Sequence, residues 1–358
     1  MHTFAVARAV HGIEPLVAAE IRRSRLGVVR GVRHREVWFE APPGADLLGL
    51  RTADDVLLAA AVVDGIGHDR SALRRLAGAA RELDPGWVAG GGGGGLEVSA
   101  SFVGRRNYTR FEIEDAVGAE LARPSRVPYH SRSDGGRPPL GAMAWRVTIE
   151  GDQAVIAVRV ADRPLHRRAY KAASIRGTLH PPVAAAMAHL AQLDSAQLGG
   201  DRLDGDRLGS ARTVLDPCCG AGTTLVEARA VAGSARTRFL GFDLDPAALA
   251  AATANAAHPD FGRSPFAWTM ADGGRLPVDA GSVDRVLVNP PWGRQVPPAG
   301  LLARGLGPLW REVRRVLAPG GLAVALVHGE IPDGFAVEET VEVSLSGQHP
   351  LIAVLRPR

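Results

Sequence analysis

Cysteine is nearly absent from this sequence. The 358 residues include two cysteines, Cys218 and Cys219, and these are neighbours in the chain. Adjacent cysteines can form only a strained disulfide and supply too few ligands for a zinc site, so a disulfide framework and a cysteine-based metal centre are both excluded. We interpret the pair as two small residues of a protein that works in a reducing compartment, the cytoplasm, and we expect no bound metal.

Long apolar runs are also missing. No stretch approaches the roughly 20 apolar residues that a membrane-spanning helix needs. Near the N-terminus, His2, Arg8 and His11 interrupt the segment in which a signal peptide would be continuously apolar, so we expect neither a targeting signal nor a membrane segment. With 46% hydrophobic and 22% charged residues, the composition is typical of a soluble globular protein. A length of 358 residues predicts two or three domains.

Lysine occurs once, at Lys171, among 42 basic residues. Because alanine and glycine are abundant as well, the excess of arginine is typical of a GC-rich coding bias and does not by itself indicate a nucleic-acid partner. The distribution of charge is more informative, since residues 101–176 hold 14 basic and 8 acidic residues while the flanking regions are neutral or slightly acidic. A concentrated basic block indicates contact with phosphates, and a solvated surface is the alternative.

The segment from Thr213 to Leu225 has the pattern of a strand, a glycine loop and the start of a helix. Gly220 and Gly222 keep bulky side chains away from the backbone N–H groups of the loop, and the following helix N-terminus favours an anionic group. Asp243 ends the next apolar run, about 20 residues after the loop, where a ribose diol is commonly bound. These features predict a nucleoside-cofactor site, and a tight turn that binds nothing is the alternative.

A second motif, Asn289-Pro290-Pro291-Trp292, follows the apolar run Val283–Val288. At the C-terminal end of a strand, this tetrad places an amide oxygen, a carbonyl that precedes a proline and a flat ring next to the predicted cofactor site. Such a group can accept both protons of an exocyclic amine while the ring stacks on a base. The alternative is a proline turn that merely closes a strand.

From Thr213 onward, apolar strand patterns alternate with helical patterns, which predicts an α/β fold with a mainly parallel sheet. The expected strands are 213–217, 238–243, 266–271, 284–289, 321–328 and two within 337–355. Gly329–Ala336 is too short for a parallel crossover, which needs a dozen or more residues, so either the pairing there is antiparallel or the helix is a single turn. The helical stretch Thr178–Leu193 carries His180 and His189, which we do not expect to bind metal because no third ligand of suitable spacing accompanies them.

Upstream, short strand and helix patterns predict α+β structure. The glycine run Gly90–Gly95 predicts a flexible linker. We therefore expect an N-terminal α+β (ferredoxin-like) module over 1–89, the linker over 90–95, a region over 96–176 that holds the basic block and a connector, and a cofactor-binding domain over 177–358. Gly151-Asp152 predicts a hairpin between two strands of the third segment.

The motifs together carry a resemblance. The loop Asp216–Thr223, the segment Gly241–Asp245 and the tetrad that starts at Asn289 resemble the landmarks of class I S-adenosylmethionine-dependent amino-methyltransferases, over residues 177–358. The region before residue 177 is similar to that of THUMP-containing RNA methyltransferases. The resemblance implies a Rossmann-like domain with a seven-stranded sheet, preceded by an α+β THUMP-containing region. It also implies S-adenosylmethionine as cofactor and S-adenosylhomocysteine as product.

The resemblance assigns roles to individual residues. Asp216 and the loop would hold the methionine part, Asp243 the ribose and Asp272 the adenine amine. The expected cofactor-binding set is Asp216, Cys218, Gly220, Gly222, Thr223, Asp243, Asp272 and Asn289, and the expected catalytic set is Asn289, Pro290, Pro291 and Trp292. The expected RNA-binding residues are Arg105, Arg106, Arg167, Arg168, Tyr170 and Lys171, because arginines interleaved with a tyrosine can contact phosphates and stack on a base. A linker whose arginines bind carboxylates of the catalytic domain is the alternative.

The target atom is implied by the resemblance alone. The tetrad limits the choice to exocyclic amines, and the similarity to THUMP-containing tRNA guanine-N2 methyltransferases favours N2 of a guanosine in structured RNA, above all tRNA. An rRNA guanine-N2 methyltransferase, a DNA adenine-N6 or cytosine-N4 methyltransferase, and an RNA-binding protein with a vestigial methyltransferase domain are the alternatives. The sequence leaves a monomer and a homodimer equally open.

Overall fold

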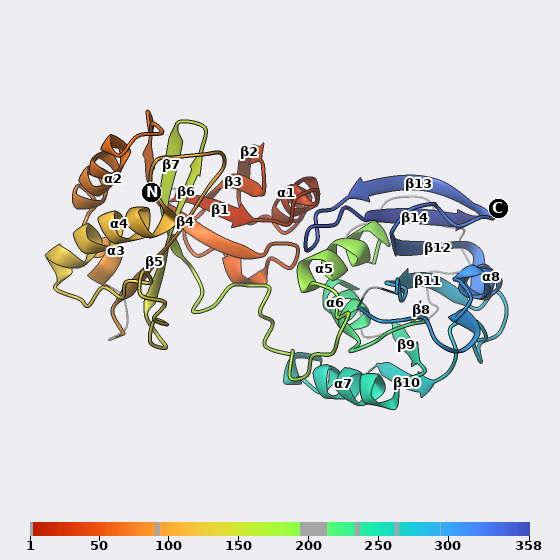
Figure 1. Cartoon of the computed structure of the whole chain (residues 1–358). Helices are drawn as coiled ribbons and strands as arrows, with labels where there is room; N and C mark the ends of the chain where they lie inside the picture. The colour runs from red at the N-terminus through yellow and green to blue at the C-terminus, as the bar shows by residue number, and fades with distance from the viewer. Residues whose placement is uncertain (1–2, 90–93, 194–212, 233–236, 262–264, 294) are drawn as a thin grey trace. The chain divides into compact units, whose positions relative to one another are not determined.

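The computed structural model describes residues 3–89, 94–193, 213–232, 237–261, 265–293 and 295–358 (Figure 1). The chain forms two compact units. The first contains Met1–Arg8, Ser24–Gly49 and Asp55–Leu165, and the second contains Ala9–Arg23, Leu50–Asp54 and His166–Arg358. No helix in the described part of the chain has the length and apolar character that crossing a membrane requires.

The first unit is built on one seven-stranded sheet with the order β2-β3-β1-β4-β7-β6-β5. All its neighbouring strands pair antiparallel except β5 and β6, which are parallel. The strands are β1 (Thr3–Arg8), β2 (Val28–Arg33), β3 (Glu36–Ala41), β4 (Asp55–Val63), β5 (Leu96–Phe102), β6 (Met143–Glu150) and β7 (Gln153–Arg159), and the helices are α2 (Ser71–Arg81), α3 (Gly86–Ala89) and α4 (Arg110–Ser125). Helix α4 starts at a capping box in which the hydroxyl of Thr109 accepts from Glu112 N and the Glu112 carboxylate accepts from Thr109 N. Apolar side chains of α2 and α4 share a core with Trp145, which is 1% exposed.

The observed division of the chain differs from the expected one. Residues 1–89 and 96–176 were predicted to be separate, but β4 pairs with β7 from Leu57↔Arg159 to Val63↔Ala154, so both segments contribute strands to one sheet. This pairing joins residues about 100 positions apart, which local sequence patterns do not record. The expected hairpin at Gly151-Asp152 is confirmed by the β6–β7 pair. Most of the predicted glycine linker, residues 90–93, lies outside the described residues.

The second unit is an α/β domain, as predicted, and its seven-stranded sheet has the order β10-β9-β8-β11-β12-β14-β13. Five neighbouring strands are parallel, whereas β14 is antiparallel to both β12 and β13. The far edge of the sheet is therefore antiparallel, as one of the two alternatives for the short Gly329–Ala336 segment held, but β12 and β13 do not pair with each other because β14 lies between them. The strands are β8 (Thr213–Asp216), β9 (Arg238–Asp243), β10 (Phe266–Met270), β11 (Val283–Val288), β12 (Leu317–Val327), β13 (Phe335–Glu342) and β14 (Leu351–Pro357), and the helices are α1 (Glu14–Arg23), α5 (Pro181–Leu190), α6 (Thr223–Ala232), α7 (Pro246–Ala256) and α8 (Gly307–Val316).

Local sequence explains where the helices of this unit begin. The side chain of Asp245 caps α7 by accepting from Ala247 N at 2.8 Å, and Pro246 occupies the first turn, where a missing N–H costs nothing. Helix α5 also begins with prolines, directly after His180. The segment 166–180, hereafter the connector, precedes α5 in this unit.

A buried carboxylate ties the connector to α6. Glu227 is fully buried and accepts from Tyr170 Oη at 2.8 Å, from Arg168 Nε at 2.9 Å and from Arg51 Nε at 2.8 Å. Burial and then the charge of Glu227 raise the pKa of Tyr170, so its phenol stays protonated and donates. Two guanidinium groups and one hydroxyl thus compensate a carboxylate that could not be buried alone.

We expect Glu227→Ala to lower the free energy of unfolding by about 3–5 kcal/mol, because the substitution leaves two guanidinium groups without their buried partner. Urea denaturation followed by circular dichroism measures the change. Glu330→Ala removes an exposed carboxylate and serves as the control, with an expected change within about 0.5 kcal/mol. Equal stability of the two variants would contradict the importance of the buried cluster.

Candidate functional site

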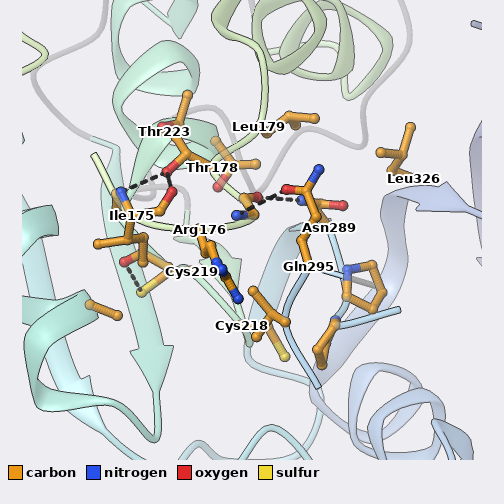
Figure 2. A pocket seen from close by; sticks show the side chains of 18 of the residues that line it. Ile175, Arg176, Thr178, Leu179, Cys218, Cys219, Thr223, Asn289, Gln295 and Leu326 are labelled. Atoms are coloured by element: carbon orange, nitrogen blue, oxygen red, sulfur yellow. Dashed lines mark hydrogen bonds between the residues drawn. The ribbon is translucent and has the colours of Figure 1, made fainter. Parts of the chain in front are cut away.

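A cavity of about 870 Å³ opens in the second unit along the C-terminal ends of its parallel strands. Its lining includes Asp216 at the end of β8, Asp243 at the end of β9, Asn289 after β11 and His328 after β12. The connector supplies further lining residues, among them Ile175, Arg176, Thr178 and Leu179 (Figure 2). Ligands of open α/β sheets bind at this edge, so the cavity lies where the two sequence motifs predict it.

The glycine loop is organised around Asp216, which is 1% exposed. One oxygen of its carboxylate accepts from Cys218 N at 3.0 Å, and the other accepts from the hydroxyl of Thr224. Burial, together with the nearby charge of Asp243, raises the pKa of Asp216 to about 7. Gly222 has φ +75°, and a Cβ there would lie 2.8 Å from Trp268 Cη2, so both the backbone conformation and the packing require glycine.

Asp243 lies across the loop from Asp216. Its Oδ2 accepts from Gly220 N at 2.9 Å and its Oδ1 accepts from Asp245 N at 3.0 Å. The two hydrogen bonds fix the carboxylate at the cavity wall and leave further acceptor capacity on each oxygen. A carboxylate held in this way can accept from a diol.

Thr223, the first residue of α6, lines the cavity and is 3% exposed. Its Oγ1 is buried and has no hydrogen-bond partner among the described residues. A buried hydroxyl without a partner is costly, so this atom marks a position where a bound polar group is expected. Because it stands at a helix N-terminus, an anionic group such as a carboxylate fits it best.

The two neighbouring cysteines of the glycine loop form part of the cavity wall. Cys218 and Cys219 are both free thiols, and both line the cavity. Burial raises the pKa of each thiol well above its ordinary value, and the neighbouring carboxylates add to this effect. The thiols are therefore neutral and act as small wall residues.

The tetrad is anchored to the connector through Gly177. Asn289 Nδ2 donates to Gly177 O at 3.4 Å, and Gly177 N donates to Gln295 Oε1 at 3.1 Å (Figure 2). A Cβ on Gly177 would lie 2.7 Å from Val296 Cγ2, so glycine permits this close approach. With its nitrogen directed to a backbone carbonyl, the amide of Asn289 keeps its oxygen as an acceptor.

Trp292 is half-buried and lies beside His328, with the ring centroids 5.0 Å apart and the planes at 57°. Its indole N–H is buried and has no hydrogen-bond partner among the described residues. Pro290, Pro291 and Trp292 all line the cavity together with Asn289. The structure thus gathers the whole predicted catalytic set at one place.

Asp272 is placed differently from the other predicted cofactor-binding residues. Ala271 and Gly273 line the cavity, but Asp272 does not. Its carboxylate turns to the backbone, with Oδ1 accepting from Gly274 N at 2.8 Å and Oδ2 accepting from Leu301 N at 2.7 Å. Gly222 also stands outside the lining, behind the loop. The adenine contact of Asp272 therefore stays a prediction that the geometry does not favour.

The structure corrects the RNA-binding role of Arg168 and Tyr170. The side chain of Arg168 is 8% exposed and Tyr170 is 4% exposed, and both donate to Glu227. Neither can reach a phosphate or a base from this position, and the alternative of a linker arginine bound to a carboxylate of the catalytic domain holds for Arg168. Arg167 and Lys171, in contrast, line the cavity.

Arg105 and Arg106 belong to the first unit, and their side chains differ in exposure and in hydrogen bonding. Arg106 donates to Gly67 O at 3.0 Å and to Gly151 O at 2.6 Å, so its guanidinium group holds loops together. This engagement corrects its predicted role as a phosphate contact. Arg105 is exposed and remains available to a ligand.

Several lining residues were not predicted from the sequence. Arg176 belongs to the basic block and could have been found by its charge, but Gly177, Gln295 and His328 belong to no motif. Gln348 and Ser346 reach the cavity from the turn between β13 and β14. The pairing of the strands brings that turn to the same cavity as the tetrad, so no local sequence pattern predicts that these two residues line it.

Comparison with known proteins agrees with this geometry. Residues 168–339 match the family model described as UPF0020, RMKL-like, methyltransferase domain. The tRNA (guanine(6)-N2)-methyltransferase of a Thermus thermophilus strain is 33% identical over 354 residues, which cover 96% of this chain and 96% of that protein. The crystal structure of TrmN from Thermus thermophilus superposes with a TM-score of 0.78 at 29% identity and covers all of both chains.

A ribosomal RNA large subunit methyltransferase K/L from Alcanivorax borkumensis is 27% identical over 313 residues. These residues make up 72% of this chain but 41% of that protein. The match thus covers 96% of the Thermus relative but less than half of the Alcanivorax relative.

The raised pKa of Asp216 predicts a dependence of stability on pH. Between the ordinary value of 3.8 and about 7, the folded state keeps a proton that the unfolded state has released, so the carboxyl destabilises the fold progressively as pH rises through this window. Asp216→Asn cannot ionise. We therefore expect the variant to gain about 2–3 kcal/mol of unfolding free energy relative to the wild type between pH 5 and pH 8.

Urea denaturation at both pH values measures this difference. Asp333→Asn, which removes an exposed carboxylate, is the control and should show no such change. A pH-independent difference between Asp216→Asn and the wild type would mean that Asp216 is ionised across the whole range.

Proposed function

This chain belongs to the family of S-adenosylmethionine-dependent RNA methyltransferases represented by the Thermus thermophilus tRNA (guanine(6)-N2)-methyltransferase, and from this premise we propose that it methylates the N2 amine of guanosine 6 in tRNA. The position of the tetrad carries the proposal. Asn289, Pro290 and Trp292 line the same cavity as the glycine loop, so an amine acceptor set and a cofactor site face one another.

The residues of the cavity fit S-adenosylmethionine. The unpartnered hydroxyl of Thr223 and the first turn of α6 suit a carboxylate, and the carboxylate of Asp216 suits the ammonium group of the methionine part. Asp243 would accept from the ribose hydroxyls, while Gly220 and Cys218 shape the wall. When bound, the cofactor supplies a methyl group already activated on a sulfonium sulfur.

The protein's own contribution to the reaction is then mainly positioning. The oxygen of Asn289 and the carbonyl of Pro290 would accept hydrogen bonds from the two N–H groups of the N2 amine, which would direct its lone pair toward the methyl group of the bound cofactor. Pro291 fixes its own backbone φ next to that carbonyl, and the ring of Trp292 would stack on the guanine. The amine must leave its base stack to enter the cavity.

Residues 96–176 and the connector would bind the RNA. Arg105 is exposed, Arg167 and Lys171 line the cavity, and the block 101–176 carries 14 basic against 8 acidic residues. We propose a THUMP-like role for this region, because a folded tRNA is a substrate recognised largely by shape. A cytoplasmic location is part of the same proposal.

Incubation with a deuterated methyl donor and separate pools of tRNA, rRNA and DNA, followed by nucleoside mass spectrometry, tests the assignment. Labelled N2-methylguanosine in tRNA is the expected product. Label in rRNA would favour the function named for the Alcanivorax relative, and labelled adenine or cytosine in DNA would overturn the proposal.

We expect Asn289→Ala to lower the rate of methyl transfer by about 100- to 1,000-fold while S-adenosylmethionine binding stays close to that of the wild type, because the missing acceptor acts on the amine. Single-turnover kinetics and calorimetry separate the two effects. Glu330→Ala, which removes an exposed side chain that does not line the cavity, is the control. Turnover of Asn289→Ala near the wild-type rate would remove this residue from the mechanism.

We also expect the combined change Arg105→Ala and Arg167→Ala to weaken tRNA binding and to make its salt dependence shallower, by roughly one unit of slope for each phosphate that is no longer bound. Binding titrations over a range of salt concentrations give the slope. Arg311→Ala removes an exposed arginine of the second unit as a control. If the double variant keeps the wild-type slope, the phosphates are bound elsewhere.

A further inference from the structure

Three side chains with metal-ligating chemistry meet beside the cavity but have no part in the proposed reaction. Asp54, His166 and His180 each offer one ligand atom, and these atoms lie within 4.8 Å of one another. All three residues belong to the second unit and are partly buried. This cluster departs from the expectation, made from the sequence, that the protein binds no metal and that His180 lacks further ligands, because the carboxylate that completes it is 112 residues before His166 and 126 before His180.

The carboxylate contacts one of the two imidazoles directly. His180 Nε2 lies 2.6 Å from Asp54 Oδ1, and the rings of His166 and His180 are 5.2 Å apart and tilted by 41°. A hydrogen-bonded pair of Asp54 and His180 would be complete without His166. The second imidazole is what gives the cluster the composition of two histidines and one carboxylate, a set that binds divalent transition metals.

The backbone carbonyl of Asp54 determines which ring nitrogen of His166 carries the proton. Its main-chain N–H donates to Asp54 O at 3.0 Å, and its ring Nδ1 lies 3.2 Å from the same carbonyl oxygen. A carbonyl oxygen can only accept, so Nδ1 carries the proton and Nε2 of the neutral ring keeps its lone pair. Metal-bound histidines commonly donate their other N–H to a backbone carbonyl in this way.

The surroundings leave room for further ligands. His166 and His180 both line the cavity of about 870 Å³, from which water can enter. Three protein ligands with an open fourth position are typical of zinc sites that are not purely structural. His180 Nε2 and Asp54 Oδ1 lie 2.6 Å apart, which is a hydrogen-bond distance. A bound metal ion would take the place of the proton in this hydrogen bond, and both atoms would then coordinate the ion.

We propose that Asp54, His166 and His180 bind one divalent transition-metal ion, with Zn²⁺ as the best match, and that this ion clips both ends of the connector to Asp54. His166 is the first residue of the connector and His180 the last. Between them the connector supplies Arg167, Lys171 and Arg176 to the cavity wall, so the ion would order the segment that faces the substrate. The site does not depend on the methyl-transfer reaction or on its target.

Titration of the chelator-treated full-length protein with ZnCl₂, followed by calorimetry, tests the site. We expect one Zn²⁺ per chain, with binding at least about 10-fold weaker in His180→Ala and in Asp54→Asn, since removing a ligand costs no less than removing an outer partner. His349→Ala is the matched control, because His349 is 62% exposed and lies 3.8 Å from a single carboxylate. Unchanged Zn²⁺ affinity in both site variants, or no stoichiometric binding to the wild type, would overturn the proposal.

Two measurements on the wild-type protein do not depend on the folding of variants. The visible spectrum of bound Co²⁺ should lack an intense thiolate band, and a strong one would place the metal at Cys218 or Cys219 instead and overturn the site.

Zn²⁺ should also slow cleavage by trypsin after Arg167, Lys171 and Arg176. Cleavage of these bonds at the same rate with and without Zn²⁺ would contradict the clip.

Discussion

The buried carboxylate of Glu227 is the interaction on which the arrangement of the site depends. It receives Arg51, Arg168 and Tyr170 in an environment from which water is excluded, so each donor is required where it stands. Helix α6, which carries Glu227, begins at the glycine loop. The hydrogen bonds to Glu227 therefore fix the position of the connector relative to the glycine loop. Because both segments line the cavity, these bonds also determine the shape of its wall.

The parallel strands then supply the chemistry. Because their carboxyl ends share one edge of the sheet, Asp216, Asp243 and Asn289 converge although 73 positions separate the first from the last. Asp216 and Asp243 differ in burial and in hydrogen bonding, so the two carboxylates suit different parts of a ligand. Asp216 is enclosed and takes up protons readily, whereas Asp243 is held by two backbone N–H groups and suits an uncharged polar ligand. Asn289 adds an amide whose orientation is set by Gly177.

Sequence patterns predicted the second unit well, because strand, loop and helix signals are local and the acidic residues stand at strand ends. The tetrad and the glycine loop were found for the same reason. The patterns failed where a partner is distant: Arg168 and Tyr170 look like RNA contacts until Glu227 is placed beside them, and the pairing of β4 with β7 joins segments that seemed separate. Asp272 shows a third limit, since a motif position does not reveal that its carboxylate turns toward Leu301.

The order of the strands at the far edge of the second sheet has a consequence for synthesis on the ribosome. Strand β14 lies between β12 and β13, so β13 has no neighbour in the sheet until β14 has emerged. The turn that joins β13 to β14 carries Ser346 and Gln348 to the cavity. The nascent chain can therefore assemble its parallel strands early, but it completes the cavity wall only after Leu351–Pro357 has left the exit tunnel.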